Sequence, residues 1–238
     1  MPAPAGRRAP SEDAGLTRRA ALVLGGAAAA SAITPIASAF GAPFSQPPLG
    51  YGLDALAPHI SARTMQLHAV DLLGSYYQRL NMVTDGTPYA ALAVADVVDI
   101  ARFEGDDPVF TAAAQVFNHE AYFAQFAGGY APPGPALEES LGREFGGLEG
   151  LAEQLFETAS TVTGSGWVWL TAEGDALYLD AVQGVENPAG SSRIIIMAVD
   201  LWEHAYIIDH GTRRNDYLSA IVLNLMNWGA AETRFLGQ

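Results

Sequence analysis

The residues with the clearest chemical potential are histidines together with one aspartate. The chain has five His and no Cys, which excludes disulfides, thiolate metal sites and Cys nucleophiles. Asp200 is predicted to end a strand and precedes His204 by four residues, so both side chains can converge on one point. His68 and His119 lie among apolar neighbours in predicted helices, where both imidazole nitrogens need partners. Three imidazoles and one carboxylate suit iron, manganese or zinc.

Each histidine also has a structural interpretation. A single His on a helix is more often a hydrogen-bonded core or surface residue than a ligand, and spacing alone does not bring residues 68, 119 and 200–204 together. His59 follows a proline, and His210 lies in a polar stretch. We interpret these two as exposed or structural residues.

Composition limits the class of protein. The chain has 238 residues, half of them apolar and 16% charged, which favours a packed globule over a disordered chain. Its 12 basic residues are all Arg, against 26 acidic residues, and the net charge is −14. Without a basic block, a nucleic-acid or anionic-membrane partner is disfavoured.

The elements that must position these side chains follow from hydrophobic spacing. Helices are predicted at residues 61–81, 89–102, 108–126, 137–145, 148–161, from 201 onward and 217–228. Strands are predicted at 167–171, 176–182 and 193–199, the first two as a hairpin. The Gly/Pro-rich stretch 128–135 separates an all-helical part from a mixed part. The predicted class is α+β.

The first residues have the layout of a signal peptide. Arg18 and Arg19 precede a weakly apolar stretch of residues 20–32, and the small residues at 37–39 form a cleavage pattern. The paired arginines resemble a twin-arginine signal. An amphipathic helix or membrane anchor is the alternative. We expect a signal at 1–39, a helical domain at 40–130, an α/β domain at 131–238 and a periplasmic or secreted mature protein without a membrane segment.

Several motifs resemble the iron/manganese superoxide dismutase family over about residues 53–235. The family signature Asp-x-Trp-Glu-His-Ala-Tyr is matched by residues 200–206. Further matches are Asp-Ala-Leu-Ala-Pro-His-Ile-Ser at 54–61, Ala-Gln-Val-Phe-Asn-His at 114–119 and Gly-Ser-Gly-Trp-Val-Trp-Leu at 164–170. The resemblance implies a helical hairpin domain followed by an α/β domain with a three-stranded antiparallel sheet. It implies one iron or manganese per subunit, held by His68, His119, Asp200 and His204.

The resemblance also implies the reaction and the surrounding roles. Superoxide would be converted to dioxygen and hydrogen peroxide as the metal is alternately reduced and oxidised. Gln115 matches the glutamine that binds the metal's solvent, and Tyr76 matches the gateway tyrosine. The pocket positions are Phe117, Trp167, Trp202 and Arg214, where the arginine attracts the anion. Glu203 matches a residue that bridges to His204 of the other subunit, so we expect a homodimer.

Two features bear on the metal and on turnover. Gln115 precedes His119 by four residues, as in iron-type members, whereas manganese types take this glutamine from the sheet region, where Gly184 or Val185 stands here. Iron is therefore favoured and manganese stays possible, because Gln183 lies nearby. Leu72 and Ile207 replace the family's funnel histidine and its partner tyrosine. This matched loss leaves open a metal-binding protein with little turnover; a metal-dependent hydrolase or oxygenase is less well supported.

Overall fold

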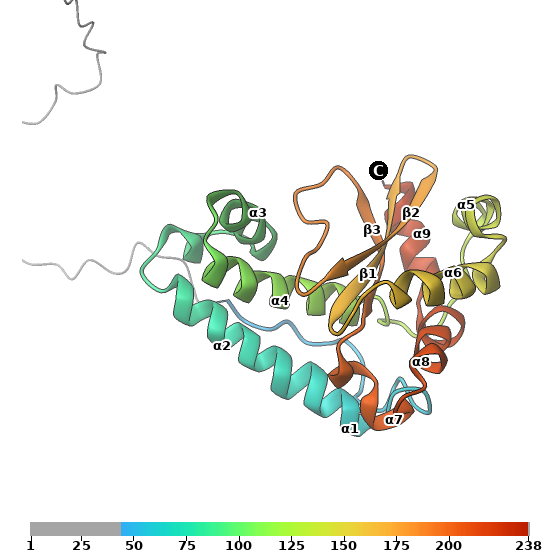
Figure 1. Cartoon of the computed structure of the whole chain (residues 1–238), viewed down its shortest axis with the longest axis horizontal. Helices are drawn as coiled ribbons and strands as arrows, with labels where there is room; N and C mark the ends of the chain where they lie inside the picture. The colour runs from blue at the N-terminus through green and yellow to red at the C-terminus, as the bar shows by residue number, and fades with distance from the viewer. Residues whose placement is uncertain (1–43, 238) are drawn as a thin grey trace, which may run out of the picture. The chain divides into compact units, whose positions relative to one another are not determined.

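Residues 44–237 are described by a computed structural model (Figure 1). The predicted signal at 1–39 lies outside the described residues. The α+β class, with a helical hairpin followed by a three-stranded antiparallel sheet, is confirmed. Within 44–237, no helix combines the length and apolar character needed to cross a bilayer.

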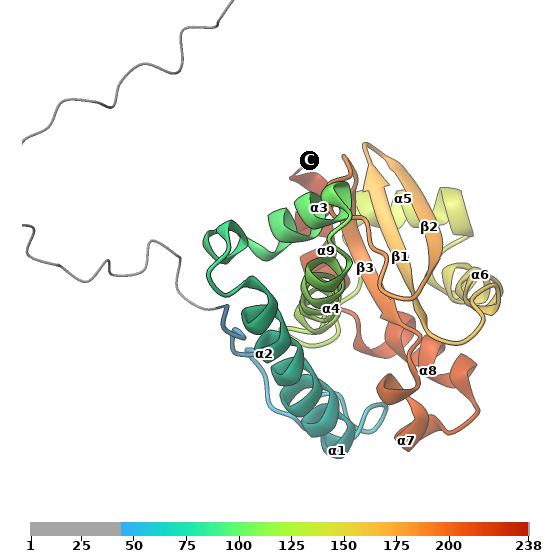
Figure 2. The same ribbon diagram turned by 60° about the vertical axis from the view of Figure 1, so that its left-hand side comes forward.

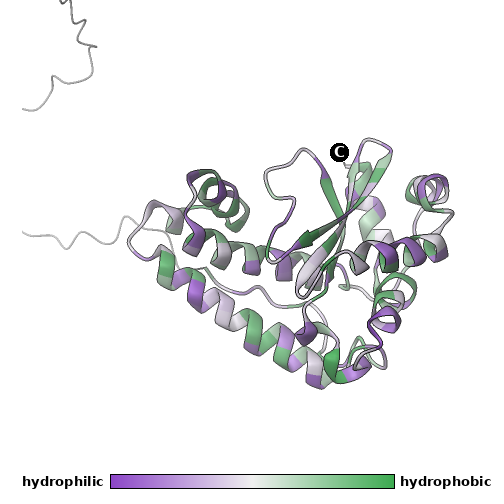
Figure 3. Cartoon of the chain, in the orientation of Figure 1, coloured by the Kyte–Doolittle hydropathy of each residue, from purple (hydrophilic) through white to green (hydrophobic). Residues whose placement is uncertain are grey.

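The helical part is a hairpin of two long helices. α1 (Ala62–Met65), a π-helical segment (Gln66–Leu72) and α2 (Leu73–Thr84) follow one another directly, beginning at Ser61, whose hydroxyl accepts from the Thr64 amide. α4 (Asp107–Ala124) packs beside α2 (Figure 1, Figure 2). Hydrophobic and hydrophilic residues alternate around both helices (Figure 3), as expected for helices with one buried face.

The predicted helix at 89–102 is wrong in its first part. Pro88–Ala91 form a 3₁₀ turn, Leu92 and Ala93 are extended, and α3 spans Val94–Glu104. α3 ends at Gly105, whose φ of 71° is a left-handed conformation that glycine adopts readily. α3 packs against α4.

The sheet has β1 (Gly166–Glu173) between β2 (Ala176–Gln183) and β3 (Ile194–Asp200), and both pairings are antiparallel. α4 and α9 (Trp228–Leu236) contact β3, while α5 (Pro135–Phe145) and α6 (Leu148–Ser160) contact β2, from the two sides of the sheet (Figure 2). β1 is therefore buried over seven of its eight residues. The register pairs Trp167 with Asp200 and so brings two predicted site residues together at one end of the sheet.

The end of the chain differs from its prediction as a single helix at 217–228. A 3₁₀ turn (Glu203–Ala205) and α7 (Ile207–His210) are followed by α8 (Arg214–Ala220) and a second π-helical segment (Ile221–Leu225). α9 then begins anew, because the Asn227 side chain caps it by accepting from the Ala230 amide. The backbone amides of Asn227 and Trp228 donate to the carbonyls of Gln125 and Ala131, which fixes this turn.

The Gln125 side chain forms hydrogen bonds with the backbone at the free edge of β3. Gln125, directly after α4, accepts from the Ala198 amide at 3.1 Å and donates to the Ala198 carbonyl at 2.8 Å. Gln125→Ala would leave both buried backbone groups without partners, so we expect the free energy of unfolding to fall by about 2–4 kcal/mol. Urea unfolding measures this loss, with the exposed Gln66→Ala as a control expected within about 0.5 kcal/mol of the unaltered protein. Equal values for both variants would contradict the prediction.

Candidate metal centre

His68 lies in the π-helical segment of the first helix. The Leu73 amide donates to the His68 carbonyl five residues earlier, and the extra residue in this turn changes the direction of the side chains it carries. Such segments occur often at functional sites. The long helix predicted at 61–81 is confirmed, although the sequence did not indicate its π-helical turn. His68 is nearly fully buried.

His119 is fully buried in α4. Its Nδ1 lies 2.7 Å from the carbonyl oxygen of Gln115, one turn earlier. This backbone contact fixes the ring and assigns the proton to Nδ1, which leaves the Nε2 lone pair available to a metal.

Asp200 and His204 come from the end of β3 and the 3₁₀ turn after it. One Asp200 oxygen, Oδ1, accepts from the Trp202 amide at 2.7 Å, and the Asp200 carbonyl accepts from the Tyr217 hydroxyl at 3.0 Å. The other carboxylate oxygen, Oδ2, is turned to the histidines. The aspartate is therefore oriented before any metal binds.

The four predicted ligands meet at one point. Asp200 Oδ2 lies 3.2 Å from Nε2 of His68, 3.2 Å from Nε2 of His204 and 3.6 Å from Nε2 of His119. One ligand atom from each of the four residues lies within 4.8 Å of all the others. Only the His204 side chain, 26% exposed, reaches solvent appreciably. The structure thus joins residues that are separated by more than a hundred positions in the sequence.

The protonation states suit a cation. Burial lowers the pKa of His119 to about 3, and burial likewise lowers the pKa of His68 although Asp200 opposes it. Burial acts to raise the pKa of Asp200, but the imidazoles of His204 and His68 beside its Oδ2 hold the pKa well below its usual value. At neutral pH, His68 and His119 are neutral and Asp200 is anionic, the forms in which they bind metals.

Polar atoms without partners mark the same place. Seven buried side-chain atoms in the described part of the chain lack a hydrogen-bond partner. Five of them belong to predicted site residues: Nε2 of His68 and of His119, Oε1 of Gln115, and Nε1 of Trp167 and of Trp202. Because buried polar groups are normally satisfied, this concentration calls for a further group. A metal ion with a bound solvent molecule fits the donor set, with the imidazoles and carboxylate as its ligands.

Some of the predicted pocket residues lie beside the metal ligands and others make contacts elsewhere. The Tyr76 and Trp167 rings lie 5.0 and 5.1 Å from the His119 ring, and the Trp202 ring stacks on His204 at 5.8 Å. Phe117 instead packs against Trp169, at 6.4 Å. Arg214 donates to the carbonyl of Ala159.

Three residues beside the ligands were missed by sequence reasoning. The Phe123 and Tyr122 rings lie 4.8 and 5.3 Å from the His68 ring. Tyr217 donates to the Asp200 carbonyl, as described above, and is within 3.1 Å of the Tyr122 hydroxyl. Tyr122 and Phe123 follow His119 by three and four residues, so the helical period could have indicated their side of α4.

The two candidate glutamines have different environments. Gln115 is nearly fully buried with a free amide oxygen, as noted above. Gln183 is exposed, and its amide donates to the carbonyls of Thr163 and Ser165. Gln183 is thus engaged with a surface loop. Of the two histidines interpreted as exposed or structural, His210 is buried and its Nε2 lies 2.7 Å from the His59 carbonyl, a structural contact.

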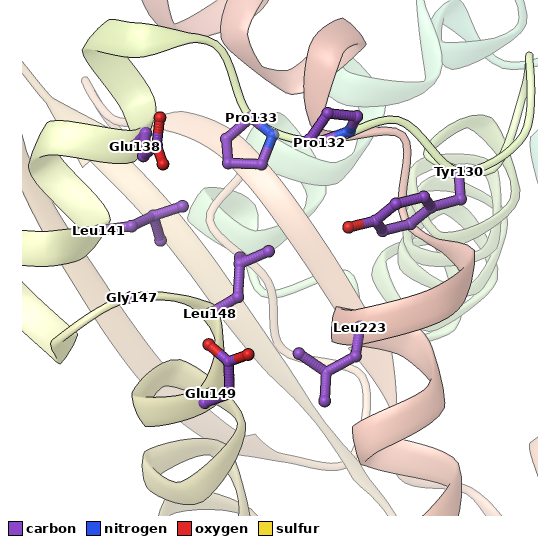
Figure 4. A pocket seen from close by; sticks show the side chains of 9 residues that line it. All are labelled: Tyr130, Pro132, Pro133, Glu138, Leu141, Gly147, Leu148, Glu149 and Leu223. Carbon is purple, nitrogen blue, oxygen red and sulfur yellow. The ribbon is translucent and has the colours of Figure 1, made fainter.

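A hollow of about 380 Å³ lies elsewhere, between Tyr130, Pro132, α5 and the start of α6 (Figure 4). Its carboxylates, Glu138 and Glu149, stand in the first turns of α5 and α6, where acidic side chains stabilise the helix. None of the predicted site residues lines this hollow.

Asp209 connects α7, which follows the turn that carries His204, to the start of the helix that continues to His68. Its carboxylate accepts from the Ser61 amide at 2.8 Å and the Thr64 hydroxyl at 2.7 Å, joining α7 to the start of α1. Burial acts to raise the pKa of Asp209, but the hydrogen bonds from Ser61 and Thr64 hold it below its ordinary value. The carboxylate therefore stabilises the fold above the unfolded-state pKa of about 3.9, and this contribution is lost as the pH falls through the folded-state pKa.

Asp209→Asn should consequently lower stability at pH 7, on the order of 1–3 kcal/mol for charged hydrogen bonds. The difference from the unaltered protein should shrink as the pH falls below about 4. Thermal unfolding measured between pH 7 and pH 3 follows this difference. Asp216→Asn, which removes an exposed ion pair with Arg213, is the control and should show little change at any pH. A difference that grows on acidification would contradict the assignment.

In the described part of the chain, the fold and the cluster define a candidate site for a single metal ion between a helical hairpin and an α/β domain. Comparison with known proteins agrees: residues 43–127 match the alpha-hairpin domain, and residues 132–234 the C-terminal domain, of the iron/manganese superoxide dismutases. The chain belongs to the iron/manganese superoxide dismutase family.

Named relatives include both metal forms. An iron superoxide dismutase of Legionella pneumophila is 35% identical over 193 residues, covering 80% of this chain and 97% of that protein. A manganese superoxide dismutase of Thermus aquaticus is 35% identical over 203 residues, covering 82% and 98%. An iron superoxide dismutase of Leptolyngbya boryana is 35% identical over 191 residues, covering 78% and 94%. The names therefore support an iron or manganese enzyme without choosing between the metals.

Proposed function

We propose that this protein is an iron-dependent superoxide dismutase, with the ion held by His68, His119, Asp200 and His204. The observation that carries the proposal is the convergence of four donor atoms in a buried site of a superoxide dismutase fold, where burial keeps His68 and His119 neutral and Asp200 stays anionic. Bound iron would supply reversible one-electron transfer, which oxidises one superoxide to dioxygen and reduces another to hydrogen peroxide.

The surrounding side chains would handle protons and exclude water. Burial, with a smaller contribution from Asp200, raises the pKa of Tyr76 to about 12, so its phenol stays protonated at neutral pH and can donate a hydrogen bond. The free amide of Gln115 is available to a metal-bound solvent molecule. Trp167, Tyr122 and Phe123 surround the histidines with aromatic surface, which lowers the local polarity and strengthens electrostatic interactions inside the site.

Iron is favoured over manganese by the glutamine. The buried Gln115 on the His119 helix corresponds to the iron-type arrangement, whereas Gln183 is committed to surface carbonyls. Elemental analysis and a dismutation assay on the same purified sample test the proposal. Near-stoichiometric iron with dismutation supports the proposal. Manganese with dismutation overturns the choice of metal. Full metal occupancy without dismutation overturns the proposal that the protein is a superoxide dismutase.

We further propose a homodimer through the surface around Glu203. Glu203 is exposed, and the neighbouring His204, which contacts Asp200 through Nε2, is itself partly exposed. The π-helical segment and the 3₁₀ turn are in contact and carry, with α7, the exposed apolar residues Leu67, Val70, Ile207 and Ile208. Sedimentation analysis should give a dimer that Glu203→Ala weakens and Glu157→Ala, on exposed α6, does not. A monomer at micromolar concentration would contradict this proposal.

Finally, we propose export by the twin-arginine route to the periplasm or medium. The support is the layout of residues 1–39 in the sequence alone. N-terminal sequencing of protein from the extracytoplasmic fraction should find cleavage near Ala39. A double substitution Arg18→Lys and Arg19→Lys should retain the precursor in the cytoplasm, while the same change at Arg7 and Arg8 should not. Unprocessed protein confined to the cytoplasm in the unaltered strain would contradict export.

A further inference from the structure

The loop between β2 and β3 is held against the helical hairpin. In Figure 2 it runs beside α3 and α4, and its contacts come from side chains of those helices. Gly190 has a φ of 77°, and a Cβ at this position would collide with the Asp99 carboxylate of α3. The loop therefore lies close against α3 at Gly190.

Arg102 on α3 makes most of these contacts. Its Nη1 donates to the Ala189 carbonyl at 2.9 Å, and its Nη2 is 3.0 Å from both the carbonyl and the side-chain oxygen of Asn187. The guanidinium also lies 5.0 Å from the centre of the Phe110 ring of α4. Only the planar fork of an arginine reaches such a set of acceptors from one side chain.

Asn187 in turn forms a hydrogen bond with the helix that carries His119. Its Nδ2 donates to Oδ1 of Asn118 at 2.9 Å, and Asn118 donates through Nδ2 to the Val185 carbonyl at 3.0 Å. Asn118 is fully buried and directly precedes His119 in α4. The loop thus fixes the backbone and side chain beside a metal ligand.

The same loop fixes the aromatic wall of the site. Trp169 Nε1 donates to the Glu186 carbonyl at 3.4 Å. The Trp169 ring stacks on Trp167 at 5.8 Å, and Trp167 contacts the His119 ring at 5.1 Å. A displaced loop would therefore disturb His119 from two directions, through Asn118 and through the two tryptophans.

We propose that Arg102 is a positioning residue for the metal centre: it fixes residues 185–189 so that their carbonyls orient Asn118, which precedes His119, and Trp169, which stacks on the Trp167 ring beside His119. Arg102 itself touches neither the four ligands nor their aromatic neighbours among the described contacts. It acts only through the loop. The inference rests on the proposed function, because the consequence for activity requires a metal at these ligands.

The test compares Arg102→Met, which keeps the apolar stem but removes the donors, with Asn187→Ala, which breaks the next link. Arg193→Met is the matched control, because Arg193 also lies over an aromatic ring, Tyr178, and pairs with one carboxylate, Asp180, away from residues 185–189. The full-length mature protein is loaded with iron for absorption spectra and pH–rate profiles. Amide and indole hydrogen exchange is followed on the metal-free protein.

Both Arg102→Met and Asn187→Ala should shift the iron absorption band and the pH midpoint of dismutation, and lower kcat by roughly 3- to 10-fold. This is less than the 10- to 100-fold typical for groups bonded directly to ligands. Their double variant should lose less than the sum of the two effects, because both act through one network. Exchange at Asn118 and at the Trp169 indole should accelerate in both. Arg193→Met should change none of these readouts.

Unchanged exchange at Asn118 and Trp169 in Arg102→Met would overturn the inference whether or not the protein binds metal. An unshifted absorption band and pH midpoint, with only a lower unfolding temperature, would also overturn it, because Arg102 would then support the fold alone. Should Arg102→Met not fold, Asn187→Ala decides by the same readouts, since it leaves the arginine on Phe110. Failure of the unaltered protein to bind metal would contradict the proposed function separately.

Discussion

Asp200→Asn is expected to abolish metal binding and dismutation while leaving the fold intact. Asparagine keeps an oxygen for the Trp202 amide and leaves the Tyr217 contact to the backbone carbonyl unchanged. Its Nδ2 would stand where Oδ2 now faces the three histidines at 3.2–3.6 Å. The amide would donate to the imidazole lone pairs that a metal needs. The substitution therefore removes the one anionic ligand and blocks two or more of the others.

Iron affinity should fall by well over 100-fold, because roughly 100-fold is the upper limit of the loss when a group outside the ligand set is removed. Elemental analysis, dismutation and the stabilisation of the fold by added iron should be lost together, because metal that binds only the folded state stabilises it. Asp216→Asn removes a carboxylate of the exposed pair with Arg213 and should change none of these. Retention of a full metal complement in Asp200→Asn would show that the cluster is not the metal site.

The site was predictable from the sequence in part. Asp200 and His204 are four residues apart at the end of a strand, so local spacing alone indicated that they converge. His68 and His119 come from two other helices, and only the resemblance to a family linked them to this pair. Hydrophobic periodicity cannot predict the contact between these helices and residues 200–204, because the contact depends on how the hairpin packs on the sheet.

The fold, like the site, was predictable from the sequence only in part. The three strands and the long helices follow from hydrophobic period, and their observed bounds differ from the predicted ones by a few residues. The break at Met226–Asn227 did not follow, because it is stabilised by carbonyls of Gln125 and Ala131 about a hundred residues earlier. The hydrogen bonds of Arg102 could not be predicted from the sequence for the same reason, because their acceptors lie in a loop more than eighty residues later.

Gln115→Leu is expected to separate catalysis from metal binding. Leucine has a similar size and removes the amide whose oxygen is free and buried on the helix that carries His119. The Gln115 carbonyl still holds His119 Nδ1, so the ligands keep their orientation. Iron content should stay near that of the unaltered protein, while kcat falls by about 10- to 100-fold, the usual effect of removing a group that supports a metal site from outside the ligand set.

Gln183→Leu decides whether the glutamine is the iron-type or the manganese-type one. Its amide bonds only the surface carbonyls of Thr163 and Ser165, so its loss should cost little activity with iron. Assays of both variants loaded with iron and with manganese give four rates to compare. A large loss in Gln183→Leu with little change in Gln115→Leu would reverse the assignment of iron, because the solvent-binding amide would then come from the sheet.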